Sequence, residues 1–472
     1  MDSPHVVILP FPAQGHIKPM LMLAELLSQA GFTISFVNNE QSHRRLDQAA
    51  FRRRCPGIEF LSIPDGLPPD HPRTGPSTVD LFFSTNTVSK PIFKNLIASM
   101  SRPPPACIIS DGIMSFAIDV AADLGIPAIT FRTFSATCTW TYFHLQKLIQ
   151  EGEIPVLQGS DEDMDKLISC IPGLENIMRR RDLPQICRLD PENPILKFYV
   201  TESSKMTKAS ALILNTFEEL EAPAISHLRT IFPAVYAIGP LQTASKSSAA
   251  SYNSSSLLQI DQSCLSWLDS QPSRSVLYVS FGSVIVLNRD QFMEFWFGLV
   301  NSEKSFLWAI RPDMIWDENG PSKVPEELIM GATERGRIVG WAPQEDVLAH
   351  DAVAGFLTHS GWNSTLESIS VGKPMICWPV IADQQVNSRC VSEMWKVGMD
   401  MKDICDRSTV EKLVRDLMEG RREDIMKSTV EIAGLAQDSV REGGSSDRNI
   451  KKLIEDIKLL HSTKNASRTI ID

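Results

Sequence analysis

The sequence predicts an α/β protein made of two Rossmann-like, doubly wound domains. Short apolar runs alternate with longer amphipathic stretches, which is typical of parallel strands covered by helices on both faces. The alternation stops at a Ser/Ala-rich segment, residues 243–256, and then starts again, so the pattern occurs twice. The chain has 472 residues, which is more than a single hydrophobic core usually accommodates.

In the first half of the chain, four apolar runs have the length and composition of buried strands. They cover residues 5–10, 32–37, 106–110 and 128–131. Apolar residues with helical spacing predict helices over residues 18–30 and 115–124. We therefore place a first domain at residues 1–240 and an exposed linker at residues 241–256.

The second half repeats the rhythm of strand and helix. Predicted strands cover residues 275–281, 305–310, 337–339, 355–358 and 375–378, and predicted helices cover residues 289–301 and 364–371. We place the second domain at residues 257–445. Within residues 446–472, helical spacing predicts a terminal helix followed by a frayed tail. The residues that carry this spacing are Ile450, Leu453, Ile454, Ile457 and Leu460.

Composition and charge disfavour several classes of partner. Lys and Arg number 46 and Asp and Glu number 57, giving a net charge of −11, whereas a protein that reads nucleic acid needs a basic surface. No apolar run is long enough to span a bilayer, and no basic segment precedes the first one, so we expect neither a membrane span nor a signal peptide. The nine cysteines show no CxxC pair and no zinc-ligand spacing, which favours free thiols in a reducing cytoplasm.

Two polar residues of the first domain follow predicted strands. His16 lies in the turn after the first strand, near the start of a helix, where the helix dipole favours the neutral imidazole that a general base needs. Asp111 follows the strand at 106–110 and so comes to the same edge of the sheet. A carboxylate there can orient the histidine and stabilise its protonated form. Both residues also have structural alternatives, a helix cap for Asp111 and a packed turn for His16.

The densest group of candidate binding residues begins at Trp341, whose flat ring suits a nucleotide base. Gly361 and the backbone amides of Asn363 and Ser364 open a predicted helix, and such an N-terminus suits a diphosphate. Trp341 could equally belong to the core. Taken together, these residues predict a nucleotide site in the second domain.

The same segment ends with residues that suit a sugar. Glu367 lies one helical turn after Asn363 and can reach ribose hydroxyls. Asp383 and Gln384 can together hydrogen-bond the hydroxyls of a hexose. Although Glu367 alone could be a solvated surface residue, the combination with Trp341 predicts a nucleotide sugar as ligand.

Residues 341–384 resemble the signature box of plant UDP-dependent glycosyltransferases. The motifs PFPAQGHIKPM at 10–20, SFGS at 280–283 and DQQVNSR at 383–389 are similar to that family too, and the resemblance covers nearly the whole chain. It implies the GT-B fold, in which two Rossmann-like domains face each other across a cleft and the terminal helix returns to the first domain. It also implies an inverting transfer with a UDP-sugar as co-substrate and no other cofactor. Within the family, the chain most resembles the branch that glucosylates terpenoid and iridoid acceptors, with phenolic acceptors second.

Carried over residue by residue, the resemblance makes His16 the catalytic base and Asp111 its partner. It assigns uracil to Trp341 and Ala342, the ribose to Gln344 and Glu367, the phosphates to Ser283, His359, Asn363 and Ser364, and the sugar to Trp362, Asp383 and Gln384. The helix N-terminus and His359 are expected to meet the charge of the diphosphate, so no metal is implied. Gln at position 384 goes with glucose in this family, so we expect UDP-glucose as donor.

The acceptor pocket is the least defined part of this interpretation. Loops of the first domain should line it, and the candidates are Phe82, Phe83, Met114, Phe134, Trp140 and Phe143. These side chains suit a small, largely apolar metabolite with one reactive hydroxyl or carboxyl, bound by a monomeric enzyme. Each of them could also be an ordinary core residue.

Other enzyme classes lack their motifs in this sequence. There is no Gly-x-Gly-x-x-Gly of nicotinamide enzymes, no phosphate-binding loop that ends in Gly-Lys-Ser/Thr, and no Gly-x-Ser-x-Gly elbow of hydrolases. Residues 160–165 (SDEDMD) contain the DxD spacing that binds a metal in a different glycosyltransferase fold, but here it lies in a polar loop. The alternative from another class is a non-catalytic protein that binds sugar nucleotides, which would be expected to lack His16 and Asp111.

Overall fold

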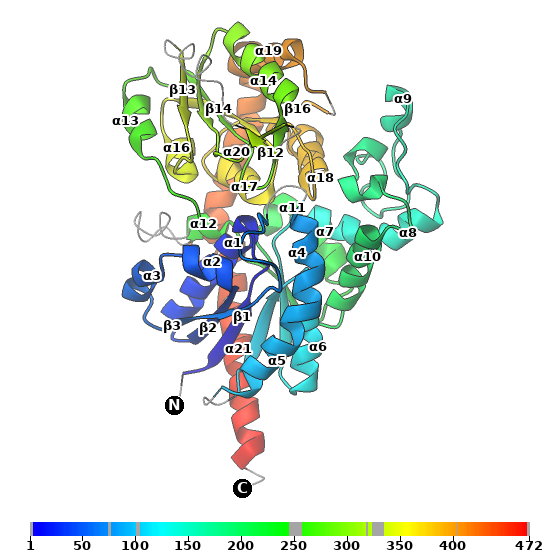
Figure 1. Cartoon of the computed structure of the whole chain (residues 1–472), viewed down its shortest axis with the longest axis vertical. Helices are drawn as coiled ribbons and strands as arrows, with labels where there is room; N and C mark the ends of the chain where they lie inside the picture. Colours follow the sequence, from blue (N-terminus) through cyan, green and yellow to red (C-terminus); the bar gives the residue numbers. More distant parts are fainter. Residues whose placement is uncertain are drawn as a thin grey trace. The chain divides into compact units, whose positions relative to one another are not determined.

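The computed structural model describes residues 3–73, 77–100, 104–244, 257–317, 320–322, 335–402 and 404–469. The chain forms two compact units, each built on a parallel sheet with helices packed against it (Figure 1). The first unit comprises Met1–Gln146, Glu192–Leu257 and Asp438–Asp472, and the second comprises Lys147–Pro191 and Leu258–Gln437. The predicted α/β class with two Rossmann-like domains is therefore confirmed.

The first unit contains a seven-stranded sheet in the order β3-β2-β1-β4-β5-β6-β7, in which every pair of neighbours is parallel. Its strands are β1 (His5–Leu9), β2 (Thr33–Asn39), β3 (Ile58–Ile63), β4 (Cys107–Asp111), β5 (Ala128–Arg132), β6 (Ala211–Leu214) and β7 (Val235–Ala237). The strands β1, β4 and β5 are adjacent, so the residues that follow them meet at one edge of the sheet. Sequence periodicity missed β3, β6 and β7, of which β6 and β7 are only three or four residues long.

The helices of the first unit follow the strands in a doubly wound pattern. They are α1 (Gln14–Gln29), α2 (Glu40–Arg45), α3 (Gln48–Arg54), α4 (Thr78–Ser84), η2 (Thr85–Ser89), α5 (Lys90–Ala98), α6 (Phe116–Asp123), α7 (Ala136–Phe143), α8 (Leu145–Gln150), α10 (Pro194–Met206), α11 (Glu218–Leu228), α12 (Leu241–Ala244) and α21 (Ser445–Thr469). The helix α1 begins four residues earlier than the sequence predicts, which places His16 inside its first turn. Helix α8 crosses the boundary between the two units, because the first unit's first segment ends at Gln146 and the helix continues to Gln150.

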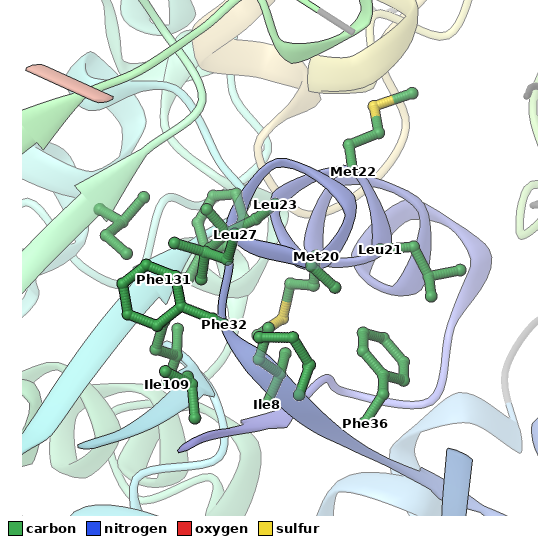
Figure 2. Close-up of a cluster of buried hydrophobic side chains, with 14 of the residues drawn as sticks. Ile8, Met20, Leu21, Met22, Leu23, Leu27, Phe32, Phe36, Ile109 and Phe131 are labelled. Carbon is green, nitrogen blue, oxygen red and sulfur yellow. The ribbon is translucent and has the colours of Figure 1, made fainter. Parts of the chain in front are cut away.

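One core holds the first unit together. Leu23 and Leu27 of α1 point at the sheet and lie beside Phe32, Ile109 and Phe131 in one buried cluster (Figure 2). Burying side chains of this size stabilises a fold by about 1.5–3 kcal/mol each, relative to leaving them exposed.

The terminal helix α21 belongs to the same core. Leu453 and Ile457 are at most 1% exposed within this cluster, and Asn449 donates a hydrogen bond to the carbonyl of Ala237 in β7. We expected each domain to be one continuous stretch of chain, whereas the first unit contains three separate segments and the second contains two. Of the expected linker, Leu241–Ala244 forms α12, and residues 245–256 lie outside the described residues.

The second unit contains a six-stranded parallel sheet in the order β13-β10-β8-β14-β15-β16. Its strands are β8 (Val276–Ser280), β10 (Ser305–Ala309), β13 (Gly336–Val339), β14 (Val353–Thr358), β15 (Met375–Cys377) and β16 (Gly398–Asp400). A small second sheet joins β9 (Leu287–Asn288), β11 (Ile315–Asp317) and β12 (Gly320–Ser322). The strands expected in this half are all present, with ends that differ by a few residues.

The helices of the second unit are α9 (Asp161–Met164), η3 (Arg180–Asp182), η4 (Gln185–Arg188), α13 (Ser263–Asp269), α14 (Arg289–Asn301), α16 (Gln344–Ala349), α17 (Trp362–Ser370), α18 (Gln384–Arg389), η5 (Cys390–Met394), α19 (Arg407–Arg415), η6 (Asp416–Gly420) and α20 (Arg422–Val440), which ends past Gln437. Ion pairs attach the segment Lys147–Pro191 to this unit, because Arg179 pairs with Asp400 and Lys402 pairs with Asp165. No helix of the described chain has the length and apolar character that a membrane crossing requires.

Candidate active site

His16 and Asp111 lie together at the carboxyl edge of the first unit's sheet. His16 Nδ1 is 2.7 Å from Asp111 Oδ2 and 2.9 Å from Thr133 Oγ1. Asp111 is 1% exposed, and its other oxygen accepts the backbone N–H of Ile113, so the carboxylate is held in place. With Nδ1–H donating to this carboxylate, Nε2 is the nitrogen that can accept a proton. The structure thus brings together the two residues that the sequence put at this edge.

A connected cluster of aromatic rings reaches His16 through two of its members, and we refer to it as the aromatic group: Phe11, Phe82, Phe134, Tyr142, Phe198 and Tyr199. The ring centroids of Phe11 and Phe134 are 5.2 and 6.2 Å from that of His16. Phe82 stacks on Phe11 at 5.0 Å, and the remaining rings contact members of the group at 5.4 to 5.7 Å. This arrangement gives the histidine a largely apolar neighbourhood, which suits an apolar acceptor.

Some of the predicted acceptor residues belong to this neighbourhood. Phe82 and Phe134 are members of the aromatic group, and Phe83 contacts Phe198 at 5.8 Å while remaining 38% exposed. Met114 is buried in the loop after β4, where its backbone N–H donates to the carbonyl of Asp111.

The other two predicted acceptor residues have different ring partners. Trp140 stacks on His227 at 4.9 Å, and Phe143 packs against Phe232 at 5.8 Å. Both lie on α7, the helix that also carries Tyr142 of the aromatic group. Their part in an acceptor pocket stays a prediction.

In the second unit, the residues expected to hold the nucleoside are joined by hydrogen bonds. Gln344, the first residue of α16, donates from Nε2 to Ser364 Oγ at 2.9 Å and to Glu367 Oε2 at 2.7 Å. Its Oε1 accepts the hydroxyl of Tyr278 in β8 at 3.3 Å. Trp341 follows β13 and its ring is only partly buried, whereas Ala342 is 4% exposed. The Trp341 ring is therefore available for stacking rather than enclosed in the core.

The helix α17 has the N-terminus that was expected to bind a diphosphate. It follows β14 at the carboxyl edge of the sheet, and its N-cap residue, Gly361, has no side chain with which to cap it. The first backbone N–H groups of a helix have no partner within the helix, and the dipole makes this end positive. The ring of Trp362 packs against Trp395 and is 3% exposed, so its side chain is a core element.

His359 lies immediately before this helix, in a turn that leaves little room. A Cβ on Gly282 or on Gly361 would come within 2.6 or 2.5 Å of the His359 ring, so both positions require glycine. Burial, reinforced by the charge of Arg311, lowers the pKa of His359 to about 4. In the neutral form an imidazole offers the diphosphate a hydrogen bond and no charge, so the positive charge expected from His359 stays a prediction.

Ser283 lies in the loop after β8, and a buried arginine fixes that loop. Arg311, which follows β10, is 2% exposed and donates from its guanidinium to the carbonyls of Gly282 and Ile285. Burial lowers the pKa of Arg311 from its ordinary value. The sequence analysis missed this residue, although an arginine at the end of an apolar strand is a visible signal.

Asp383 and Gln384 are linked to the rest of the site through backbone and side-chain hydrogen bonds. Gln384 Oε1 accepts the backbone N–H groups of Val380 and Ile381, both at 2.9 Å. Asn387 donates from Nδ2 to Asp383 Oδ2 at 2.7 Å and to the carbonyl of Ser360 at 2.9 Å. Because the Gln384 oxygen is already occupied, its Nε2 amide is the group left to donate to a sugar hydroxyl. Asn387, which joins Asp383 to the backbone of Ser360, was also missed.

The acidic stretch at residues 160–165 is paired with basic side chains. Asp161 is 2.7 Å from Arg181, and Asp165 lies within 3.1 Å of Arg179, Arg181 and Lys402. Across the residues that the structure describes, no cluster of three or more His, Cys, Asp or Glu side chains has the arrangement of a metal site. The DxD spacing therefore takes part in ion pairs that hold this segment to its unit.

Comparison with known proteins gives two family matches. The family described as "UDP-glucoronosyl and UDP-glucosyl transferase" matches residues 90–431, and the family described as "Glycosyltransferase, N-terminal domain" matches residues 2–169. Together the two matches cover both units of the chain.

Individual relatives are similar along their whole length. The 7-deoxyloganetic acid glucosyltransferase of Catharanthus roseus is 49% identical, with 97% of this chain and 98% of the relative aligned. A myricetin 3-O-rhamnoside 1,2-glucosyltransferase of Crocosmia x crocosmiiflora is 44% identical, with 97% of this chain and 96% of the relative aligned. Among solved structures, Os79 from O. sativa in complex with UDP has a TM-score of 0.83 and 27% identity, over 96% of this chain and 100% of that one.

Proposed function

The chain belongs to the family of UDP-glucosyl transferases with the GT-B fold and transfers glucose from UDP-glucose, and we propose that it does so by a direct displacement with His16 as base. The observation that carries this proposal is the 2.7 Å contact between His16 Nδ1 and Asp111 Oδ2. Asp111 fixes the ring so that Nε2 is basic, and it stabilises the imidazolium that forms. A protein that only binds sugar nucleotides has no use for this pair.

In the proposed reaction, the acceptor oxygen attacks the anomeric carbon of glucose while His16 Nε2 takes its proton. The bond from that carbon to the UDP oxygen breaks, and the leaving diphosphate is stabilised by the N-terminus of α17. A single displacement inverts the anomeric centre, so an α-linked donor gives a β-glycoside. No metal has a role in this scheme.

The donor would be held by the second unit. We assign uracil to Trp341 and Ala342, the ribose to Glu367 and Gln344, and the sugar to Asp383 and Gln384. The shared hydrogen bonds of Gln344, Ser364 and Glu367 support this assignment because they fix three of its members before the donor arrives. Ser283, His359, Asn363 and Ser364 would contact the phosphates, and the buried Trp362 would take part through its backbone.

The acceptor class comes from the relatives and from the aromatic group. We propose a small, largely apolar plant metabolite of the terpenoid or iridoid class, because one relative is named for 7-deoxyloganetic acid. A phenolic acceptor is the second candidate, because another relative is named for a myricetin rhamnoside. We further propose that the enzyme acts as a cytoplasmic monomer.

The test is a UDP-release assay with purified protein, UDP-glucose and a panel of iridoid, terpenoid and phenolic acceptors. We expect stoichiometric release of UDP and glucoside, with a β-configured anomeric proton in the product by nuclear magnetic resonance. An α-glucoside would contradict the single displacement. Absence of any glucoside across the panel would contradict the acceptor class.

A further inference from the structure

Arg132 differs from every other buried arginine that the structure describes. The buried arginines are Arg132, Arg179, Arg181 and Arg311, and the last three each lie within 3.0 Å of an aspartate. Arg132 is 3% exposed, its Nε is buried, and no described residue hydrogen-bonds or ion-pairs with its guanidinium. A guanidinium stays charged at all ordinary pH values, so burying it without an acceptor costs free energy.

The position of Arg132 is next to the catalytic pair. It is the last residue of β5, directly before Thr133, whose hydroxyl contacts His16. Its guanidinium carbon lies 4.1 Å from the ring centroid of Phe134 and 5.1 Å from that of Tyr142, both members of the aromatic group. These cation–π contacts hold the side chain against Phe134, whose ring contacts His16, and against Tyr142.

Glycine at position 112 gives this side chain its room. A Cβ on Gly112 would lie 2.7 Å from Arg132 Cδ and 3.4 Å from one of its terminal nitrogens. Gly112 directly follows Asp111, so the loop that carries the catalytic carboxylate also shapes the place of the arginine. The guanidinium and the dyad are thus built into the same edge of the sheet.

The acid whose charge interacts with Arg132 is already occupied. Glu202 of α10 feels the positive charge of Arg132, but its two oxygens accept the backbone N–H and the hydroxyl of Ser115 at 2.9 and 2.7 Å. Burial raises the pKa of Glu202, which weakens its value as a counter-ion. Its carboxylate does not come within ion-pair distance of the guanidinium, so the arginine lacks a direct partner among the described residues.

We propose that the missing partner is a carboxylate of the acceptor, so that this glucosyltransferase prefers hydroxy acids over their neutral esters. This inference rests on the proposed function and narrows its substrate class. A guanidinium offers parallel N–H donors that match the two oxygens of a carboxylate, and an apolar environment strengthens such a pair. The aromatic group would enclose the apolar body of the same molecule.

The chemistry of transfer then follows from which group Arg132 holds. The carboxylate is bound by the guanidinium, so a separate hydroxyl of the acceptor attacks the anomeric carbon and gives its proton to His16. The bond to UDP breaks and the acid is released still ionised. The product is a glucoside that resists mild alkali, not a glucose ester that alkali cleaves.

The experiment compares 7-deoxyloganetic acid with its methyl ester, in turnover and in direct calorimetric binding to the UDP-saturated protein. We expect the parent to prefer the acid by about 10- to 100-fold, the range expected when a charged hydrogen-bonded pair is lost. Arg132→Met should lower acid affinity by about the same factor and ester affinity by much less. Arg132→Lys, which keeps the charge but not the fork, should fall between them.

Arg54→Met is the matched control, because Arg54 also lies over a ring, that of Phe51, and pairs with Glu25 instead. It should leave the ratio of acid to ester unchanged. Equal binding of acid and ester by the parent, equal losses for both in a folded Arg132→Met, or an alkali-labile product would overturn the inference. Glucoside formation without a preference for the acid would contradict this inference but not the proposed function. Selective binding of the acid without any turnover would contradict the proposed function but not this inference.

Discussion

The proposed donor site in the second unit and the proposed reaction site in the first are built in different ways. In the second unit, Gln344 hydrogen-bonds directly to Ser364 and to Glu367, and all three come from a short stretch of sequence. In the first unit, His16 is surrounded by side chains drawn from distant parts of the chain, joined mainly by ring contacts. When the polar residues of a site are close together in the sequence, they form a recognisable motif. When apolar residues from several distant strands and helices form a site, no motif shows it.

The largest effect should come from the reaction end. We expect His16→Ala to lower turnover by roughly 10²–10⁴-fold, the usual value of general-base catalysis, while UDP-glucose still binds. Since we propose that the second unit binds the donor, calorimetry with UDP-glucose should separate the two regions. Turnover within threefold of the parent would remove His16 from the mechanism.

Asp111→Ala supplies the control for this pair. Because Asp111 acts through His16, we expect a smaller loss for the single change and little further loss in the double variant. A double variant whose loss equals the product of the two single losses would mean that the residues work independently.

This difference between the two sites explains how much of each could be predicted from the sequence. Trp341, Gln344 and Glu367 could be named in advance because residues 341–384 resemble a family signature, and the structure joins Gln344 to Glu367. The nearness of His16 and Asp111 could be predicted because the carboxyl ends of adjacent parallel strands meet at one edge. Their roles in binding and catalysis stay predictions.

The residues around the proposed acceptor site could not be predicted in this way. Phe198 and Tyr199 reach Phe82 from α10, more than 100 residues away in sequence, and no periodicity announces that contact. Trp140 and Phe143 are close in sequence to Tyr142, and their rings pack against His227 and Phe232. Arg132 was detectable as a charge that ends an apolar strand, yet only its lack of a partner gives it meaning.

The donor end should lose affinity when its exposed ring is removed. We expect Trp341→Ala to weaken UDP-glucose binding by one order of magnitude or more, since stacking on a base contributes about 1–3 kcal/mol. Acceptor affinity should hardly change. Trp267→Ala removes another partly buried indole from the same unit and serves as control. A Trp341→Ala protein that unfolds would show instead that the ring supports the core.

Sugar choice offers a finer test within the donor end. We expect the parent to prefer UDP-glucose over UDP-galactose by roughly 10- to 100-fold, because an axial 4-hydroxyl leaves a buried amide unpaired at a cost of about 1–3 kcal/mol. Gln384→Glu keeps an oxygen for the N–H groups of Val380 and Ile381 but removes the Nε2 donor. The preference should therefore collapse in this variant, and also shift in Gln384→His. An unchanged donor ratio in both variants would assign sugar choice to other residues.

We expect the titration of His359 to make the stability of the folded chain depend on pH. Its pKa is lowered to about 4 in the folded protein by burial and by Arg311, whereas the unfolded chain has the ordinary value of about 6.5. Between these values the unfolded state binds a proton that the folded state does not, so stability falls as pH falls from 6.5 towards 4. At pH 5 this contribution should be about 1–2 kcal/mol. Urea midpoints at pH 7 and pH 5 should therefore differ more for the parent than for His359→Gln, and equal differences would contradict the lowered pKa.

The smallest expected effect is that of a chelator, which should leave activity unchanged. The uncapped N-terminus of α17 places backbone N–H groups where the diphosphate would bind, and this positive end can stabilise the leaving group without a cation. With the pKa of His359 lowered to about 4, we expect the helix end to carry most of this role. The alternative rests on the DxD spacing of residues 160–165, but Asp161 and Asp165 are paired with Arg179, Arg181 and Lys402.

The measurement is UDP release with saturating EDTA, then with Mn²⁺ or Mg²⁺ restored, in the parent and in Asp161→Asn. A loss of activity in EDTA that Mn²⁺ or Mg²⁺ reverses would mean that the helix end does not suffice, and a reversal absent from Asp161→Asn would move the metal to that stretch.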